Sequence, residues 1–575
     1  MRIPLILIAL LSFASAQETM IRQVYDTKTD THVEVTALFT RPSMTGFLPV
    51  RVKISNNLAK QHTVKLDFSS GQDYNNRLKT QSSFFLTALP QKAVTQDFMV
   101  PVGVINHSRH TRQHNITADL SGSLGKASNT IRTEATLDMP CVLMSESLFT
   151  VNGSQLDAEI SKSKGSSYSS SAFAGKFDPK QMPNEWLAYS GYDSIMMSDI
   201  DWSNVPASGR NAILSWVNLG GQLVIYSSSS PTLTTLGLPQ DPGYGTCRIE
   251  RVGSDLKLTP SAAVDLVTKE NPSSTSIVSI CNDYNSRWPL QAHFGAQGFH
   301  YGLFIAVLVV FGIMVGPVNL FVFAKSGQRH KLFITTPLIS LVTSLILIVL
   351  IIAQDGFGGK GMRRVLMEVR PDAGQNAAFV HQEQISRTGI LTRSRFTVEP
   401  TCAFLPVPIT NSRWARFTND NDTNGQFNLQ PNNGKMAASG DWWQSRSEHG
   451  HALTAVIPTR GRIESTNTPG EFVSTFDFPI ETIYYLDSSK KWHRADAILT
   501  GKPFTPTPID STMAEPALAK EVSAFAARNS QFLARAKNRP GHFVAVTNQA
   551  PGIHTHPGIH WEKTQTVITG PVANR

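Results

Sequence analysis

Two long apolar segments dominate the hydrophobic pattern of the chain. They run over residues 301–323 and 332–353, and neither contains a charged side chain. A helix needs about 20 such residues to cross the hydrocarbon core of a bilayer, so both segments are predicted to be transmembrane helices. Only eight residues separate them. The pattern therefore predicts a tight helical hairpin in a membrane.

The first sixteen residues have the pattern of a secretory signal peptide. A positive charge at Arg2 precedes a short apolar run, which ends in the small-x-small sequence Ala-Ser-Ala. The run is about half as long as the ~20 residues that a membrane span needs, so we expect cleavage rather than anchoring. Segment 1–16 is therefore predicted to direct export, and the mature chain to begin outside the cytoplasm.

Basic residues predict how the hairpin crosses the membrane. If the chain begins outside, the first span enters and the second returns. The connecting loop with Lys325, Arg329 and Lys331 is then cytoplasmic, as the positive-inside rule prefers. A second basic group at 360–364 falls on the outer side, but the first segments usually dominate topology. Both large soluble parts are predicted to be extracytoplasmic.

Small residues in the first span suggest how its helix packs. Gly312 and Gly316 have the G-x-x-x-G spacing, and Pro317 and Asn319 follow. Small residues four apart allow a second helix to approach closely, and the proline is expected to kink the helix. We expect the glycines to face the second span. A transport path through Asn319 is not expected, because two helices without charged groups are too few.

The region before the membrane begins with strands that alternate between apolar and polar residues. Segments 32–38, 49–55 and 63–68 each place their apolar residues on one face, with turn residues between the segments. Several short strands at this spacing predict an immunoglobulin-like β-sandwich over residues 20–135. The region contains no catalytic constellation.

After the sandwich, the pattern becomes that of an α/β domain. Apolar strands are predicted at 141–145 and 193–198, and an amphipathic helix at 208–221 ends in a Gly-Gly stop. The next strand lies in "LGGQLVIYSSSS", residues 219–230. Strand, helix and strand in this order predict a βαβ unit with a parallel sheet.

The residues of this unit resemble a known family. The sequence "GYDSIMMSD", followed by "ILSWVNLGGQLVIYSSSS", resembles the class I glutamine amidotransferase-like domain, which has a flavodoxin-type fold. The motif covers about residues 190–230. The resemblance implies a flavodoxin-like α/β domain over residues 139–295.

The match is closest to the version of this domain in certain bacterial membrane proteins. Those proteins place a β-sandwich before the domain and a "GP-x-N" helical hairpin after it, as Gly316, Pro317 and Asn319 do here. As an architecture, the resemblance covers residues 20–360. The hairpin motif covers residues 312–337.

The catalytic residues of that family are missing from this chain. The family's enzymes carry a cysteine on a glycine-flanked turn, and a His-x-Glu pair later in the domain. The equivalent turn here falls near Ser227 and has neither feature. His293 has no glutamate two residues on, and the His-Gln-Glu sequence at 381–383 lies beyond the hairpin. We therefore expect a degenerate domain, with an envelope serine hydrolase that uses Ser227 or Ser228 as the alternative.

The region after the membrane, residues 362–575, is predicted to be a β-rich α+β domain. One amphipathic helix is expected between Pro516 and Pro540, followed by a strand at 542–546. Three further segments alternate in the manner of strands: 365–369, 395–400 and 471–478.

Two clusters in this last region carry candidate chemistry. Trp442 and Trp443 are expected in a second core, with a sugar-stacking platform as the alternative. His554, His556 and His560 include a His-x-His pair, which on a strand places both rings on one face, as metal ligands require. Apart from one glutamate, no carboxylate or cysteine that could complete a set of metal ligands lies nearby in the sequence. We therefore expect exposed histidines on a terminal β-hairpin, and no metal.

Composition excludes several classes of protein. The 575 residues are 41% hydrophobic and 17% charged, which is typical of folded domains. The net charge of +9 is spread thinly without a Lys/Arg run, so no nucleic acid is expected as a partner. None of the four cysteines has C-x-x-C spacing. Cys247 and Cys281 could form a disulfide in an exported chain, or remain buried thiols.

Together these features predict a multidomain protein of the bacterial inner membrane. We expect a non-enzymatic interaction or assembly protein of the cell envelope, a pseudoenzyme without catalytic residues or cofactors. Its predicted partners are the lipid bilayer, through the two helices, and other envelope proteins. A carbohydrate-binding envelope protein that uses Trp442 and Trp443 is a further alternative.

Overall fold

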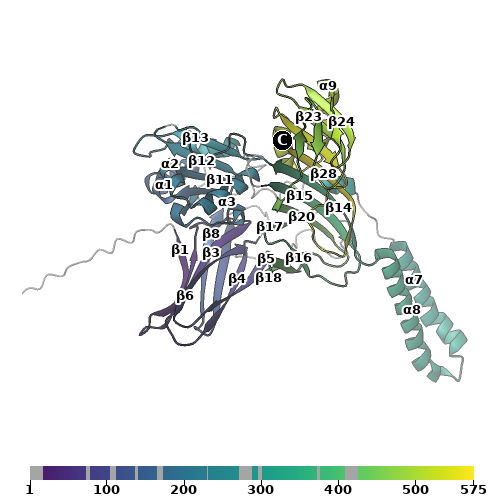
Figure 1. Ribbon diagram of the computed structural model, residues 1–575. Coiled ribbons are helices and arrows are strands. Elements are labelled where there is room, and N and C mark those ends of the chain that lie inside the picture. Colours follow the sequence, from purple (N-terminus) through teal and green to yellow (C-terminus); the bar gives the residue numbers. More distant parts are fainter. Residues whose placement is uncertain are drawn as a thin grey trace, which may run out of the picture. The chain divides into compact units, whose positions relative to one another are not determined.

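Figure 1 shows the computed structural model of the chain. The predicted signal peptide and Cys281, and with Cys281 the predicted disulfide, lie outside the described residues. The chain divides into two compact units, Met1–Ser279 and Ile280–Arg575. The structure describes residues 17–574 apart from 44, 73–77, 104–111, 136–139, 165–171, 230, 271–287, 295–300, 372–375, 408 and 410–424.

In the first unit, two antiparallel sheets enclose one apolar core. One sheet has the order β1-β2-β3-β6, and the other contains β5, β4, β7 and β8 in that order. The core draws its buried side chains from both sheets, including Val33, Val50, Leu66 and Ile116. The three alternating segments predicted from the sequence coincide with β2, β3 and β4. The strands are β1 (Glu18–Asp26), β2 (Thr31–Ala37), β3 (Phe47–Asn56), β4 (His62–Gln72), β5 (Leu78–Ala88), β6 (Lys92–Pro101), β7 (Arg112–Gly122) and β8 (Ala127–Ala135).

A five-stranded parallel sheet follows, in the order β10-β9-β11-β12-β13. The expected βαβ unit is confirmed: β11 and β12 are parallel, and the predicted helix is α3, which ends at the positive φ of Gly220. The elements are β9 (Val142–Ser145), α1 (Glu146–Lys164), β10 (Ala174–Phe177), β11 (Ser194–Ser198), α2 (Asp199–Asn204), α3 (Ala207–Asn218), β12 (Gln222–Ser227), β13 (Thr246–Arg251) and α4 (Pro260–Glu270), with 3₁₀ turns at Pro179–Gln181 and Trp186–Tyr189.

One segment joins the two parts of this unit. Phe39 follows β2 and forms an antiparallel bridge with Phe177 at the end of β10. The Thr40 amide donates to the Lys176 carbonyl at 3.2 Å, and the Lys176 amide donates to the Thr40 hydroxyl at 2.9 Å. The Phe39 ring is fully buried and packs edge-on against Tyr192. The sheet edge and the aromatic contacts therefore hold the parallel sheet to the antiparallel part.

The second unit is built on a nine-stranded sheet with the order β17-β20-β15-β14-β28-β27-β23-β24-β26. Strands β14 and β28 are parallel, and the other neighbours are antiparallel. The strands are β14 (Gly359–Arg370), β15 (Ala377–Thr388), β17 (Cys402–Val407), β20 (Glu448–Pro458), β23 (Ile480–Leu486), β24 (Trp492–Ile498), β26 (Thr507–Ile509), β27 (His542–Thr547) and β28 (Ile559–Pro571).

Smaller elements complete this unit. Strands β16 (Phe396–Val398), β19 (Lys435–Gly440) and β18 (Gly425–Asn432) are neighbours in that order, and β22 (Phe472–Ser474) lies between β21 (Ile463–Ser465) and β25 (Pro503–Phe504). The short helix α6 (Pro289–Phe294) precedes the apolar helices.

The single helix predicted near the C-terminus is wrong. The structure has two helices, α9 (Ser511–Ser523) and α10 (Ala527–Ala536), and Pro516 lies inside the first of them. The chain breaks at Ala526, whose extended backbone begins α10 and whose amide donates to the buried side chain of Glu383. A partner distant in the sequence thus divides a segment whose apolar period looked continuous.

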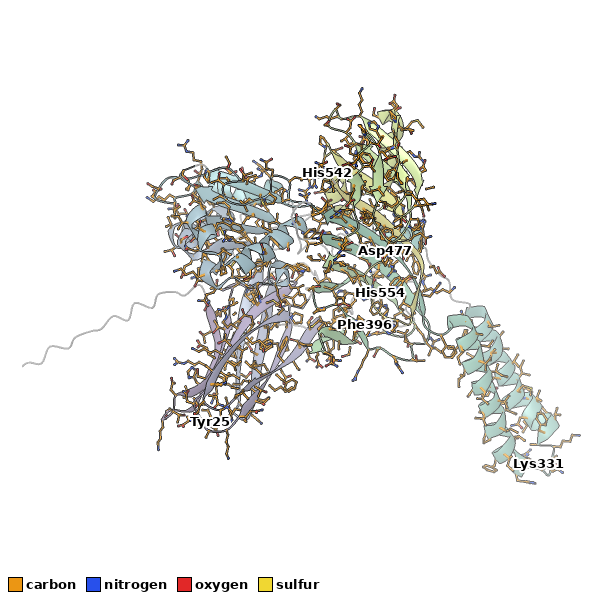
Figure 2. All side chains as sticks on the ribbon, viewed as in Figure 1. Tyr25, Lys331, Phe396, Asp477, His542 and His554 are labelled. Carbon is orange, nitrogen blue, oxygen red and sulfur yellow. The ribbon has the colours of Figure 1, made fainter. Side chains whose placement is uncertain are left out.

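Two helices are long and apolar enough to span a membrane, Gly302–Phe323 and Arg329–Gln354. The first consists of α7 (Tyr301–Ile313), which continues as a π-helix over Met314–Phe323, and the second is α8 (Leu332–Asp355), which follows a short turn at Arg329–Lys331. Pro317 lies within the π-helical part. Proline has no amide hydrogen to donate, so the wider helix accommodates the missing bond. Lys331 marks the tip of this hairpin in Figure 2.

The predicted packing of Gly312 and Gly316 against the second span is wrong. A Cβ atom added to either glycine would have no neighbour within 4 Å. The contact instead involves Asn319, which is fully buried and donates to the Thr336 hydroxyl at 2.9 Å. An amide in an apolar environment needs a hydrogen-bond partner, and the π-helical turns change which residues face the second span.

We expect Asn319→Ala to loosen the hairpin and Gly316→Leu to leave it unchanged. The first substitution removes the bond to Thr336, which is worth about 1 kcal/mol in a bilayer. The measurement is disulfide crosslinking between one engineered cysteine in each span, with Gly312→Leu as a second control. A loss of crosslinking with Gly316→Leu, but not with Asn319→Ala, would contradict this packing.

Candidate functional site

The candidate site lies where the strands of the parallel sheet end. Strands β9, β11 and β12 are neighbours, and they end at Ser145, Ser198 and Ser227. Strands of a parallel sheet bring their carboxyl ends to one edge, where α/β proteins commonly bind ligands. The first turn of α2 begins at the same edge and contributes Asp199 and Asp201.

Asp201 has hydrogen-bond partners from three neighbouring segments. Its carboxylate accepts the hydroxyls of Ser145 and Ser198, each at 2.8 Å, and also the hydroxyl of Ser147. The Ser198 hydroxyl in turn accepts from the Asp201 amide and completes a capping box at the start of α2. All these polar groups are used in holding β9, β11 and α2 together.

Ser227 does not have the geometry of a nucleophile. Its side chain is fully buried and donates to the Asp199 carboxylate at 2.5 Å, while the Ser229 amide donates to its oxygen at 3.1 Å. Its backbone does not have the positive φ of a strained nucleophile turn. Asp199 bonds this hydroxyl directly, without the histidine base that activates the serine of a catalytic triad. Ser227 thus helps to fasten β12 to α2.

A cavity of about 650 Å³ opens beside this edge, at the ends of β12 and β13. Ser228 is exposed and contributes to its wall. Burial raises the pKa of the Tyr226 hydroxyl well above its usual value, so it remains a neutral hydrogen-bond donor. Polar and apolar residues from both strands and from the approach to α4 line the cavity, among them Tyr226, Ser228, Glu250, Arg251, Lys257 and Leu258.

The candidate histidines His293 and His381 belong to the second unit of the chain. His293 is exposed on α6, in the second unit. His381 and Glu383 lie on β15 in that unit, where the His381 ring is 5.2 Å from the Phe532 ring of α10, centroid to centroid. The His-x-Glu spacing noticed in the sequence therefore belongs to the contact between β15 and α10.

Glu383 is a polar centre that sequence reasoning missed. Its fully buried carboxylate accepts the Trp288 indole N–H at 2.9 Å and the Asn529 amide at 2.7 Å. It also accepts the Ala526 backbone N–H at 3.0 Å, at the start of α10. This helix end favours a negative charge.

Burial dominates the ionisation of Glu383. It raises the pKa of the Glu383 carboxyl, and the bonds from Trp288, Asn529 and Ala526, together with the charge of Arg364, oppose that shift. Only the His-x-Glu spacing marked this residue in the sequence. Its partners lie more than ninety residues away in either direction, so no local pattern could identify them.

The three C-terminal histidines have different surroundings. His554, which is labelled in Figure 2, and His556 lie outside regular strands. His554 is exposed, and His556 is buried. His556 Nε2 lies 2.8 Å from the Arg393 carbonyl, and its ring contacts Trp443. His560 is exposed at the start of β28. The expectation of three exposed histidines is thus wrong for His556. Among the described residues, no group of His, Cys, Asp and Glu could hold a metal ion.

Trp442 and Trp443 are buried in an aromatic core. Their exposed fractions are 2% and 1%, so neither ring face is open for stacking on a sugar. The Phe404 ring stacks on Trp442, and His451 packs against Trp443. Burial lowers the pKa of the His451 ring well below its usual value, so the imidazole stays neutral inside this core.

Comparisons with known proteins give no functional assignment. No protein-family model matches the chain, and no curated protein matches its sequence. A solved calcium-binding mutant of β-glucuronidase 2 from Bacteroides uniformis is similar at 9% identity over 43% of this chain and 32% of that chain, with a TM-score of 0.15. The GAE domain of GGA2p from Saccharomyces cerevisiae is similar at 12% identity over 20% of this chain and 98% of that chain, with a TM-score of 0.11. Likenesses this weak carry no argument about fold or function.

We expect Glu383→Ala to destabilise the second unit by about 3–5 kcal/mol, because it leaves the N–H groups of Trp288, Asn529 and Ala526 without their acceptor. Glu383→Gln retains one acceptor oxygen and loses the charge, so its cost is smaller. The measurement is denaturant unfolding of the full chain in detergent. Glu399→Gln, which alters an exposed ion pair with Lys435, is the control and should have little effect.

The raised pKa of Glu383 determines whether its contribution to stability rises or falls with pH. Between the unfolded pKa of about 4.3 and the higher folded pKa, the native state binds more protons than the unfolded state. The stability of the wild type relative to Glu383→Gln should therefore be greatest below that window and fall as the pH rises through it. A difference that grows with pH would contradict the burial of this carboxylate.

Proposed function

We propose that the chain is a membrane-anchored, non-enzymatic interaction or assembly protein of the bacterial cell envelope. The observation that carries this proposal is the sheet edge, where Asp201 and Ser227 are buried and bonded within the protein. An enzyme needs reactive groups that are accessible and only partly satisfied. Groups that hold strands and a helix together suit a folded scaffold for contact with other proteins.

The domain type belongs to the same proposal. In chain order, the five parallel strands are arranged 2-1-3-4-5, which is the order of flavodoxin-like folds. This order supports the resemblance to a degenerate amidotransferase-like domain. The position where the strand order reverses, between β9 and β11, is the usual ligand site of such sheets. Here Ser145, Ser147 and Ser198 surround Asp201 at that position. We further propose that the preceding sandwich is immunoglobulin-like.

Location in the inner membrane, with both large parts outside the cytoplasm, completes the proposal. The basic residues after the second span are the observation that opposed this orientation. Arg363 donates to the Thr564 hydroxyl at 2.7 Å and lies over the Trp561 ring, and Lys360 pairs with Glu562 at 3.2 Å. Because these charged side chains have partners within the β-sheet, we give them less weight in the positive-inside rule than free charges that flank a span. The exposed cations of the connecting loop then support the proposed orientation.

A serine hydrolase remains the second candidate, because Ser228 is exposed on the wall of the cavity. The polar residues of that wall could hold a small substrate. The buried tryptophans give no corresponding support to a carbohydrate-binding function.

Fusions to alkaline phosphatase test the orientation. The enzyme should be active when fused after Arg575 and inactive when fused after Lys331, because it folds only outside the cytoplasm, where its disulfides form. The reverse pattern would contradict the proposed topology.

Labelling with a fluorophosphonate probe tests the absence of a nucleophile. We expect no labelling of the purified wild-type protein, and Ser227→Ala and Ser228→Ala should leave the biological function intact. Labelling that either substitution abolishes would establish a hydrolase and overturn the pseudoenzyme proposal. Ser229→Ala, on the next exposed serine, serves as the matched control.

A further inference from the structure

The second apolar helix continues into the β-sheet of its unit without a free linker. Helix α8 ends at Asp355, and Gly356 closes it with a bond from its amide to the Ile352 carbonyl at 2.8 Å. The Gly356 carbonyl accepts the Ile390 amide at 3.0 Å, just beyond β15. The same residue therefore ends the helix and begins the contact with the folded domain.

Gly358, two residues further on, is bonded to the same segment. The Gly358 amide donates to the Ile390 carbonyl at 2.9 Å, and the Gly389 amide donates to the Gly358 carbonyl at 2.8 Å. Gly356 and Gly358 have φ values of 69° and 79°, which suit glycine. Phe357 lies between them on a fixed turn, and 69% of its surface is exposed.

Helix length places this turn at the membrane surface. The apolar stretch 332–353 has 22 residues. At about 1.5 Å per residue it is roughly 33 Å long, close to the ~30 Å of the hydrocarbon core. The basic residues at 325–331 hold the other end of the helix at the opposite surface. Phe357, four residues past the apolar stretch, must then lie at the level of the phospholipid headgroups.

Two cationic side chains lie on the loop next to Phe357. Ile390 bridges to Phe357, and the loop 391–395 continues from it. Arg393 and Arg395 are exposed on this loop. The carbonyl of Arg393 is held by the ring of His556 at 2.8 Å, which fixes the loop to the aromatic core. The loop that carries the two guanidinium groups thus begins beside the turn that carries the exposed aromatic ring.

We propose that Phe357, Arg393 and Arg395 form a membrane-docking surface for anionic phospholipids. The proposal rests on the proposed insertion of the hairpin. Aromatic rings are enriched at the boundary between headgroups and acyl chains. Guanidinium groups bind phosphate oxygens through paired hydrogen bonds. The ring inserts at that boundary while the two arginines bind headgroup phosphates, so the second unit rests on the bilayer and is held there by more than its hairpin.

A phospholipid is the occupant that the geometry favours over a protein partner. The turn begins at the last residue of a spanning helix, so lipid surrounds it on every side that the domain leaves open. The charge of the surface also fits, because anionic headgroups attract nearby Lys and Arg residues.

Photo-crosslinking to lipid tests this surface in the full chain. The photoreactive residue p-benzoylphenylalanine is placed at position 357, at position 345 within the second span, and at position 513 on α9. Met513 is 67% exposed, which matches Phe357, and it lies on α9 rather than at the end of an apolar helix. The protein is reconstituted in nanodiscs of equal parts phosphatidylcholine and phosphatidylglycerol, and lipid adducts are counted by mass spectrometry.

We expect lipid adducts at positions 345 and 357, with position 357 exceeding position 513 by about tenfold. Adducts at 345 combined with equal yields at 357 and 513 would overturn the docking surface and leave the membrane anchor intact. A lack of adducts at all three positions would overturn the proposed insertion as well.

Reversing the charges of Arg393 and Arg395 tests their role separately. Arg393→Glu combined with Arg395→Glu should lower the yield at position 357 several-fold in the mixed nanodiscs, and by less in phosphatidylcholine alone, because the attraction to anionic lipid becomes repulsion. The control is Lys490→Glu with Lys491→Glu, which changes the same charge in the exposed turn between β23 and β24. An unchanged yield with the arginine pair, or an equal loss with the lysine pair, would overturn the role of the arginines.

Discussion

A carboxylate buried away from water must find hydrogen-bond donors, and the second unit is organised around one such group. Glu383 on β15 takes its donors from Trp288, which precedes the first apolar helix, and from Ala526 and Asn529 at the start of α10. Removing a charge from water is costly unless every lone pair is used. Trp288, in the segment before the first apolar helix, is therefore fixed to the β-sheet, and the second apolar helix continues directly into that sheet through Gly356. The β-sheet of this unit is thus bonded both to Trp288, before the first apolar helix, and to the turn after the second.

Buried polar groups in the first unit also need hydrogen-bond partners, and this requirement bears on function. The polar residues at the end of the parallel sheet resemble the beginnings of a catalytic site, but Asp201 and Ser227 are consumed in fastening strands to α2. In an enzyme, such groups would be held ready for a substrate at some cost in stability. Here they stabilise the fold, and the sheet is further joined to the preceding strands through Phe39 and β10. Because these groups serve the fold, the edge supports the proposed role in assembly.

Local patterns predicted the elements and missed what joins them. The apolar spans, the alternating strands and the βαβ unit follow from periodicity within one segment, and the structure contains all three. The break at Ala526 depends on a carboxylate 143 residues away, so the continuous period of that segment predicted one helix. Gly312 and Gly316 had the right spacing for a helix contact, but the π-helical turns around Pro317 and the demand of Asn319 for a partner put another face against α8. A sequence motif thus indicates a possible contact, and which contact forms depends on the buried polar groups that need partners.

Hydrogen exchange of the full chain in nanodiscs, read by mass spectrometry, tests most directly whether Glu383 joins the membrane hairpin to the β-sheet. We expect the peptides covering Trp288–Phe294 and the start of α10 to be protected in the wild type and to lose that protection together in Glu383→Ala. Peptides of the parallel sheet in the first unit should not change, because the described hydrogen-bond partners of this carboxylate all lie in the second unit. Rapid exchange of Trp288–Phe294 in the wild type, or protection there that survives the loss of Glu383, would show that the segment before the membrane is independent of the domain that we describe as holding it.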